Sequence, residues 1–299
     1  MFKKGRSWTS LSKRESRNAY IFLSPILVLY TLFALIPIGM LFYLSFTEYS
    51  VLMPSKWIGL ENYKYLFLKD TVFIQSVINT SYYVAGTIFP TILLGLLFAM
   101  LVNRPLRGKG IIRSCIYLPY VTPVIAAALV WRFLYEPFEG GFINYLISWF
   151  GIKPINWLGT IRWALPSIMV MSIWRNVGFS MVLFLAGLQG IPERYYEAAK
   201  IDGANRVQQF WHITLPLLKP VILFVLVLAT IGAFQVFQEP YIMTEGGPAL
   251  STITIVYWFY LMSFRSLRFG RGSAISLILA MMIFILSIFY LKVLKFKEE

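Results

Sequence analysis

Long apolar runs, separated by short clusters of charged residues, dominate the pattern of hydrophobic and polar positions along the chain. Four of these runs contain no charged side chain and extend over at least 19 residues: 18–47, 71–103, 220–238 and 272–291. Residues 114–131 are also uncharged, and 163–192 carry a single charge, Arg175. A helix needs roughly 20 mostly apolar residues to cross a bilayer. The pattern therefore predicts six transmembrane helices, at 19–46, 72–102, 111–134, 161–188, 216–239 and 270–291.

The predicted fold class is an all-α membrane protein, because the runs are long and lack the two-residue period of a transmembrane β-strand. The first run is about twice as long as the apolar core of a signal peptide, and no A-x-A-like cleavage site follows it, so we expect an uncleaved first helix. The expected organisation is a cytoplasmic tail (1–18), a first helix with its outer loop (19–71), a five-helix core (72–291) with a cytoplasmic loop at 190–216, and a cytoplasmic tail (292–299).

Composition and charge support a membrane location. Hydrophobic residues make up 58% of the chain and charged residues only 13%, whereas soluble domains carry about 25% charged residues. This balance excludes a water-soluble monomer and a disordered chain. Of the Lys and Arg residues, 17 fall on the predicted side of the termini and nine on the other. Positive residues accumulate on the cytoplasmic side, so we expect a multi-pass protein of the bacterial or archaeal cell (inner) membrane with both termini in the cytoplasm. The net charge of +14 then reflects these flanks and contact with membrane lipid, and no nucleic-acid partner is expected.

Few residues are available for redox or metal chemistry. Cys115 is the only cysteine and His212 the only histidine, so a disulfide framework is impossible. We expect no special role for either residue, no metal site and no cofactor.

The loop after the fourth predicted span has the features of two short helices. Pro192 suits a first helical turn, and Gly203 suits a helix end. Asn205 followed by Gln208 resembles a capping box that starts a second helix. Ala199 and Gly203 share a face, where small side chains would let another surface approach closely. The alternative is a solvated connector between two spans.

The same loop carries a resemblance to a known family. Glu197-Ala198-Ala199, then Gly203 after three residues, Ile213 after nine more, and Leu215-Pro216 resemble the EAA loop of permeases in ATP-binding-cassette (ABC) importers. Further segments are similar to the sugar-type permeases: Gly59-Leu60-Glu61-Asn62-Tyr63, Trp174-Arg175-Asn176-Val177-Gly178-Phe179 and Gln235-Val236-Phe237. The resemblance covers about residues 17–291 and is greatest to the first permease of maltose- and glycerol-phosphate-type systems. The extra N-terminal spans and large outer insertion of the maltose subunit are absent from this sequence.

The resemblance implies a type I ABC importer permease fold and a division of labour. A second homologous permease, in a heterodimer, would complete the pathway. Two ATP-binding subunits would hydrolyse ATP, and an extracellular solute-binding protein would deliver a carbohydrate. The chain itself would be non-catalytic, since it contains no G-x-x-x-x-G-K-[ST] phosphate-binding loop. The residues expected to couple to an ATPase subunit are Glu197, Ala198, Ala199, Asp202 and Gly203.

Polar and aromatic residues within the spans are candidates for the substrate pathway, because a polar group in a membrane costs free energy unless it is satisfied. These candidates are Asn79, Thr122, Trp174, Asn176, Phe179, Gln235 and Gln238. Each has a structural alternative: amides often join neighbouring helices, and aromatic side chains often face lipid. For Arg175 we favour a structural or gating ion pair.

Three other function classes are alternatives to an importer. An ion-coupled secondary carrier would place ionisable residues or broken helices at the membrane midplane, and Arg175 is the one clearly central charge. A membrane enzyme would need a catalytic constellation within the spans. The sequence also does not exclude the pore geometry of a channel. Within the importer class, glycerol phosphate or another small polar solute is an alternative to a sugar.

Overall fold

A computed structural model of the chain describes residues 10–50, 53–104, 107–137 and 140–293. The predicted tails therefore lie partly outside the described residues, at 1–9 and 294–299. The first half of the chain forms α1 (Ser10–Tyr30), the π-helical turn η1 (Thr31–Leu35), α2 (Ile36–Ser45), β1 (Thr47–Ser50), β2 (Met53–Trp57), α3 (Glu61–Leu68), α4 (Thr71–Val102), α5 (Lys109–Val121), α6 (Val124–Leu134) and α7 (Phe142–Ser148). The second half forms α8 (Ile161–Gln189), α9 (Arg194–Ile201), α10 (Arg206–Gln209), η2 (Phe210–Thr214), α11 (Leu215–Phe234), α12 (Gln238–Met243), α13 (Ile255–Tyr260), η3 (Leu261–Arg265) and α14 (Phe269–Val293).

The helices account for the predicted spans, with one change in the third. Within the described residues, five helical segments are long and apolar enough to cross a membrane, and α5 with α6 makes six if this bent pair is one span. The two helices meet at 96°, so the continuous helix predicted over 111–134 is wrong. Pro123 has no N–H to donate and disfavours helical geometry at Thr122, which is extended. The break is therefore a local consequence of the sequence Thr-Pro.

The fifth predicted span also ends earlier than expected. We predicted a helix through residue 239, but α11 stops at Phe234 and α12 begins at Gln238. The intervening residues turn the chain, and the Thr254 hydroxyl donates a 2.8 Å hydrogen bond to the carbonyl of Val236 in this turn. This second break matters because it brings polar side chains into the interior.

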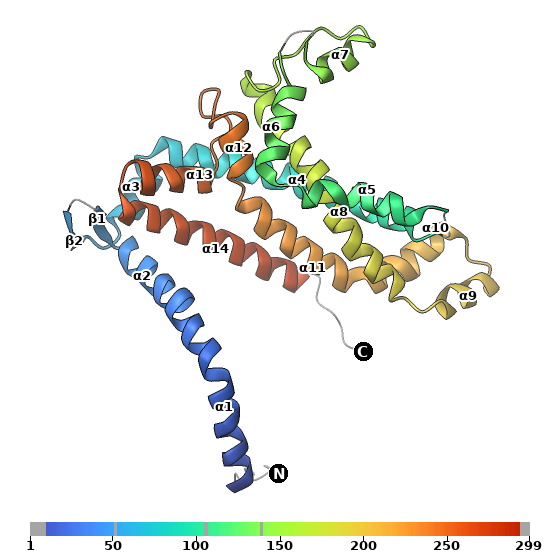
Figure 1. Cartoon of the computed structure of the whole chain (residues 1–299), viewed down its shortest axis with the longest axis horizontal. Helices are drawn as coiled ribbons and strands as arrows, with labels where there is room; N and C mark the ends of the chain where they lie inside the picture. Colours follow the sequence, from blue (N-terminus) through green and yellow to red (C-terminus); the bar gives the residue numbers. More distant parts are fainter. Residues whose placement is uncertain (1–9, 51–52, 105–106, 138–139, 294–299) are drawn as a thin grey trace.

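The long helices α4, α8, α11 and α14 run side by side, and α4 packs most extensively against α8 (Figure 1). Small residues allow these close approaches, as is usual for helices packed in a membrane. A Cβ at Gly95 of α4 would lie 2.7 Å from the Cβ of Ser180 in α8. A Cβ at Gly178 would collide with the backbone of Ile116 in α5. The buried side chains where α4, α8 and α11 meet include Phe184, Met181 and Leu218.

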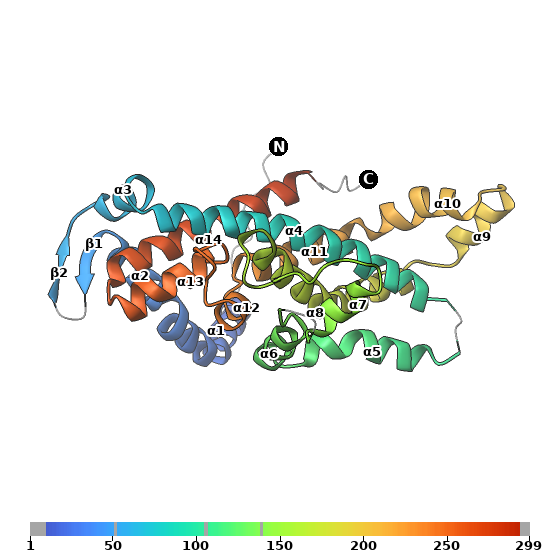
Figure 2. The same ribbon diagram turned by 90° about the horizontal axis from the view of Figure 1, so that it is seen from above.

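The ends of the bundle differ in character. The loop containing α9 and α10 projects at one end, and the two-stranded antiparallel hairpin β1–β2 lies at the opposite end (Figures 1 and 2). The arm formed by α1, η1 and α2 diverges from the other helices (Figure 1). In the most apolar stretch of this arm, none of the residues is buried, whereas 56% of the corresponding stretch of α8 is buried. The arm therefore leaves a long apolar surface uncovered by its own chain.

Candidate functional site

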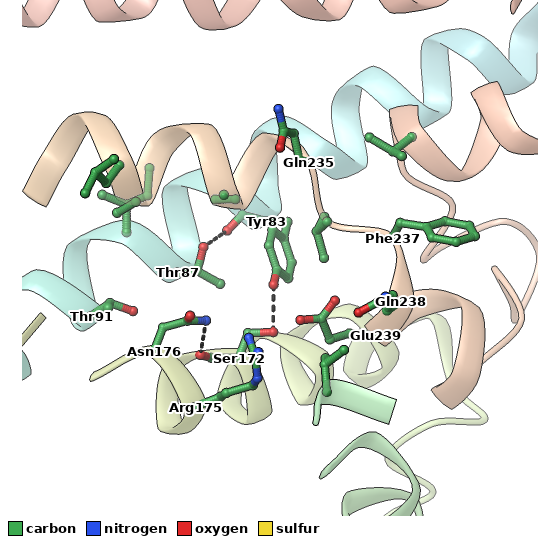
Figure 3. A pocket seen from close by; sticks show the side chains of 18 of the residues that line it. Tyr83, Thr87, Thr91, Ser172, Arg175, Asn176, Gln235, Phe237, Gln238 and Glu239 are labelled. Atoms are coloured by element: carbon green, nitrogen blue, oxygen red, sulfur yellow. Dashed lines mark hydrogen bonds between the residues drawn. The ribbon is translucent and has the colours of Figure 1, made fainter. Parts of the chain in front are cut away.

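A cavity of about 690 Å³, lined by both polar and apolar side chains, lies among α4, α8 and the break between α11 and α12. Residues of α5, α6, α11, α13 and α14 complete its lining. Figure 3 shows three groups of polar side chains facing it from separate segments of the chain. The cavity combines hydroxyl, amide and charged groups with aromatic rings, so it can hydrogen-bond a polar solute and also cover its apolar faces.

The wall formed by α4 carries Tyr83, Thr87 and Thr91 at intervals of four residues. This spacing places the three side chains on one face of a helix. Thr87 donates a 2.7 Å hydrogen bond to the carbonyl of Tyr83, and the Tyr83 hydroxyl donates a 2.6 Å bond to the Ser172 hydroxyl on α8. The second bond joins the two walls inside the membrane-spanning region, where few other polar partners are available.

The wall formed by α8 carries Ser172, Arg175, Asn176 and Phe179. Asn176 donates a 2.8 Å hydrogen bond to the carbonyl of Ser172, which leaves its amide oxygen without a protein partner among the described residues. Phe179 stacks on Tyr120 of α5 with ring centroids 4.7 Å apart. The Arg175 guanidinium lies 5.7 Å from the Tyr120 ring centroid. Its buried Nε hydrogen-bonds to no group in the described part of the chain.

The third wall is the break after α11, with Gln235, Phe237, Gln238 and Glu239. Pro240 sits in the first turn of α12, where a missing N–H removes no intrahelical bond. It allows the short helix to start directly at the cavity. Glu239 is 9% exposed, and its carboxylate points towards the Ser172 side of the cavity (Figure 3).

The structure brings together four of the seven residues predicted for the substrate pathway: Asn176, Phe179, Gln235 and Gln238. The other three lie elsewhere. Asn79 bonds to carbonyls of the loop between α12 and α13. Trp174 packs edge-on against Trp131 at 5.5 Å, and Thr122 bonds to the carbonyl of Leu118 at the break after α5.

Several lining residues were not among the predicted site residues: Tyr83, Thr87, Thr91, Ser172 and Glu239. The signal for the α4 residues was present, because a polar side chain recurs every four positions in an otherwise apolar run. Ser172 and Asn176 show the same interval on α8. Glu239 gave no periodic signal, since its position depends on the break in the chain.

The predicted coupling loop forms two short helices joined by a tight turn. Gly203 has φ +80°, a left-handed conformation that suits glycine. This confirms its predicted role in ending the first helix. Asn205 accepts bonds from the N–H groups of Val207 (3.0 Å) and Gln208 (2.9 Å), and the Gln208 side chain accepts from the Asn205 N–H (2.8 Å). The predicted capping box is therefore confirmed.

The surface of this loop is accessible and largely unpartnered. Glu197, Ala198, Asp202 and Gly203 are exposed, and Ala199 is half-buried. Ile201 is apolar and 87% exposed. Ala199, Asp202 and Gly203 border a hollow of about 340 Å³. Small, acidic and apolar groups thus occur together on a projection that can enter a complementary cleft.

Two hydrogen bonds tie the loop to the start of the next span. The hydroxyls of Tyr196 on α9 and Thr214 at the end of η2 are 2.9 Å apart. Gln209 donates a 3.0 Å bond to the carbonyl of Ala204. Among the described residues, no group of three or more His, Cys, Asp or Glu side chains could hold a metal ion.

Comparison with known proteins identifies the family. Residues 91–294 match the sequence profile of the binding-protein-dependent transport system inner membrane component. The chain belongs to this family. It is 35% identical over 295 residues to the trehalose/maltose transport system permease protein MalF of Thermococcus litoralis, which covers 97% of this chain and 98% of that protein.

Other members of this transport family support the assignment over nearly the whole chain. The sulfoquinovosyl glycerol transport system permease protein SmoG of Agrobacterium fabrum is 33% identical over 293 residues, covering 97% of this chain and 94% of SmoG. The fold is similar to a chain in the crystal structure of a bacterial ABC transporter involved in alginate import. That match has a TM-score of 0.83 at 22% identity and covers 97% of this chain and all of the other. The predicted type I ABC importer permease fold is confirmed.

Proposed function

We propose that the protein is the permease subunit of an ATP-driven ABC importer and that it carries a carbohydrate across the cell membrane. The observation that carries this proposal is the α9–α10 loop. It projects from one end of the bundle (Figure 2), has the EAA spacing, and presents Ala198, Gly203 and Ile201 to solvent. A connector without a partner would not need an apolar side chain such as Ile201 at its exposed tip.

The proposed partners follow from the surfaces that the chain leaves open. A cleft on one of two ATP-binding subunits would receive α9, with Glu197 as its polar anchor. A second homologous permease would cover part of the apolar arm and close the cavity, forming a heterodimer. A solute-binding protein would dock at the opposite end, near the β1–β2 hairpin. With α9 facing a cytoplasmic ATP-binding subunit, both termini would lie in the cytoplasm.

A carbohydrate is the proposed solute because the cavity offers what a sugar requires. Asn176, Gln235 and Gln238 can bond to hydroxyl groups, and Phe179 and Tyr120 present aromatic faces. The names of relatives agree with this class, since they refer to trehalose, maltose and sulfoquinovosyl glycerol. Glycerol phosphate or another small polar solute is the alternative cargo within the same class of importer.

Substitutions in the coupling loop test the proposal. In nanodiscs that contain the whole importer, Glu197→Ala and Gly203→Leu should lower ATP hydrolysis stimulated by loaded binding protein, and should lower uptake in vesicles in parallel. Removing the Glu197 carboxylate would strand a donor on the partner, at a cost of about 1–3 kcal/mol if that donor is buried. A side chain at Gly203 must adopt a left-handed conformation and adds volume at the contact.

Glu193→Gln provides the matched control, because Glu193 is an exposed acidic residue just before α9 and outside the EAA spacing. It should leave stimulation near the wild-type value. Uptake that continues without ATP would instead indicate an ion-coupled carrier or a channel. Normal stimulation of ATP hydrolysis and normal uptake in both loop variants would show that the loop is only a connector.

A further inference from the structure

The charges in the cavity form one balanced pair. Among the described residues that line it, Arg175 and Glu239 are the only ones with a full formal charge. They come from different walls, α8 and the start of α12, and both side chains lie near Ser172 (Figure 3). No N–O distance between them falls within 4.0 Å. The two groups carry opposite formal charges, and no direct ion pair uses up their hydrogen-bonding capacity.

Both groups keep free hydrogen-bonding positions. The buried Nε of Arg175 has no partner in the described part of the chain, and the same part of the chain offers the Glu239 carboxylate no side-chain donor. An unpaired polar group in a buried site costs free energy until a partner arrives. Sugar hydroxyls suit this arrangement, because one hydroxyl can accept from a guanidinium and donate to a carboxylate.

We propose that the cavity selects an uncharged carbohydrate, and that Glu239 is the residue that rejects acidic sugars and phosphate esters. This inference rests on the proposed function, since it concerns the solute that the cavity would carry. Arg175 alone would attract an anion. The Glu239 carboxylate removes that attraction, and an anionic solute placed between the two would have to face a like charge in a partly desolvated site. A neutral sugar is not repelled by the Glu239 carboxylate and does not depend on attraction to an unbalanced Arg175.

The surrounding residues are consistent with a neutral ligand. The other polar lining groups are hydroxyls and amides, including those of Thr91, Asn176 and Gln235. The cavity is otherwise apolar or aromatic. A site for a phosphate or carboxylate would be expected to offer more than one cation or a bidentate Arg fork free of a neighbouring carboxylate. Relatives of this chain include one named for an acidic glycoside, so charge selection can differ between members of the family.

A charge-sensitive labelling experiment tests the electrostatic part without transport. Asn176→Cys in a Cys115→Ser background places a single thiol of this chain in the cavity, beside Arg175. The whole importer in nanodiscs is treated with anionic sulfonatoethyl and cationic trimethylammonioethyl methanethiosulfonate. With Glu239 present, the ratio of the anionic to the cationic labelling rate should match the ratio for a thiol free in solution. Glu239→Gln should raise the anionic-to-cationic ratio on the order of tenfold.

Glu245→Gln is the matched control, because Glu245 is a carboxylate of the same outer segment that does not line this cavity. It should leave the ratio unchanged. An anionic preference in the parent protein, or no change with Glu239→Gln, would overturn the proposal. Because labelling needs no ATP, a failure of ATP-driven uptake would contradict the proposed function but would leave this result intact.

Binding of matched probes tests the choice of substrate. Radiolabelled trigalacturonate and its fully methyl-esterified form differ only in their carboxylates, as do cellobiouronic acid and cellobiose. Equilibrium dialysis against the whole importer should favour the uncharged member of each pair by on the order of tenfold. Glu239→Gln should narrow that ratio, and Glu245→Gln should preserve it. Preferential binding of the acidic members to the wild-type complex would overturn the proposal.

Discussion

Asn79 shows how a polar residue within a span can be structural. Its amide nitrogen donates to the carbonyls of Leu250 (2.8 Å) and Ile253 (2.9 Å). Its amide oxygen accepts from Gln75 at 2.9 Å. The first two bonds hold the loop between α12 and α13 against α4, and the third lies within α4 and orients the Asn79 amide. Two residues of that loop, Ala249 and Leu250, have positive φ, so the side chain of Asn79 supports a backbone that costs free energy to maintain.

Replacing Asn79 should loosen this loop. Asn79→Ala removes two bonds to the loop and leaves the Ile253 carbonyl without its side-chain donor, whereas the Leu250 carbonyl still accepts from the Ile253 N–H at 3.2 Å. The expected cost is about 1–3 kcal/mol. Hydrogen exchange of the amides at 250–254 should therefore accelerate. Gln75→Ala is the control, because Gln75 bonds to Asn79 but to no atom of this loop, and it should change exchange much less. Unchanged exchange combined with a weaker affinity for the transported solute would instead indicate that Asn79 contributes to the substrate pathway.

The sequence could not separate Asn79 from Asn176. Both are amides in apolar runs, and both were assigned to the pathway. Asn79 meets its partners about 170 residues away along the chain, whereas Asn176 bonds within its own helix and keeps its oxygen free. Local sequence contains the polarity of a residue but not the partner that a distant loop supplies. For the same reason, Glu239 could be noticed as polar but not placed opposite Arg175.

The helices themselves were largely predictable. The predicted spans 72–102, 161–188 and 270–291 agree with α4, α8 and α14 to within two residues at each end. Prolines were a less reliable guide to the positions of helix breaks. Pro90 and Pro166 lie inside continuous helices, whereas Pro123 marks a sharp break. Neighbouring groups can satisfy the backbone freed by a proline in a packed helix, and such neighbours are invisible to a hydropathy pattern.

A pair of side-chain hydroxyls helps to position α9, the helix proposed to contact the ATPase subunit. The Tyr196 and Thr214 hydroxyls join it to the start of α11, the helix that leads to the cavity wall. Tyr196→Phe should leave α9 folded but less firmly attached. A bond of this kind contributes about 1 kcal/mol, so substrate-stimulated ATP hydrolysis should fall up to roughly fivefold while basal hydrolysis stays unchanged.

Tyr195→Phe is the matched control for this prediction. Tyr195 lies on the same helix and contacts the Arg194 guanidinium, and its hydroxyl makes no hydrogen bond within the described chain. Thr214→Val should reproduce the effect of Tyr196→Phe. The double variant should lower stimulated ATP hydrolysis no further than either single variant. Additive losses in the double variant would show that the two hydroxyls act separately.

The orientation of the whole molecule can be tested with two surface lysines. Lys153 precedes α8 and Lys200 follows it on α9, and both are exposed. The intervening helix has 29 residues and is about 43 Å long, enough to separate the two sides of a membrane. In a Cys115→Ser background, Lys153→Cys should react with a membrane-impermeant maleimide in intact cells. Lys200→Cys should react only after permeabilisation.

Labelling after permeabilisation serves as the control for both sites. If Lys200→Cys reacted from outside intact cells and Lys153→Cys did not, the assignment of the termini to the cytoplasm would be reversed. The distribution of Lys and Arg, 17 against nine, would then have misled the prediction.

The exposed arm of α1, η1 and α2 has a consequence for biosynthesis. It is synthesised before the other described helices, and its most apolar stretch buries no residue against the rest of the chain. It can therefore enter lipid without waiting for any later segment. The α8 segment, with 56% of its stretch buried, completes its contacts only after α11 has been synthesised. Entry into lipid and acquisition of native contacts are thus separate events in this chain, and among the described candidate spans this arm contributes least to the interior.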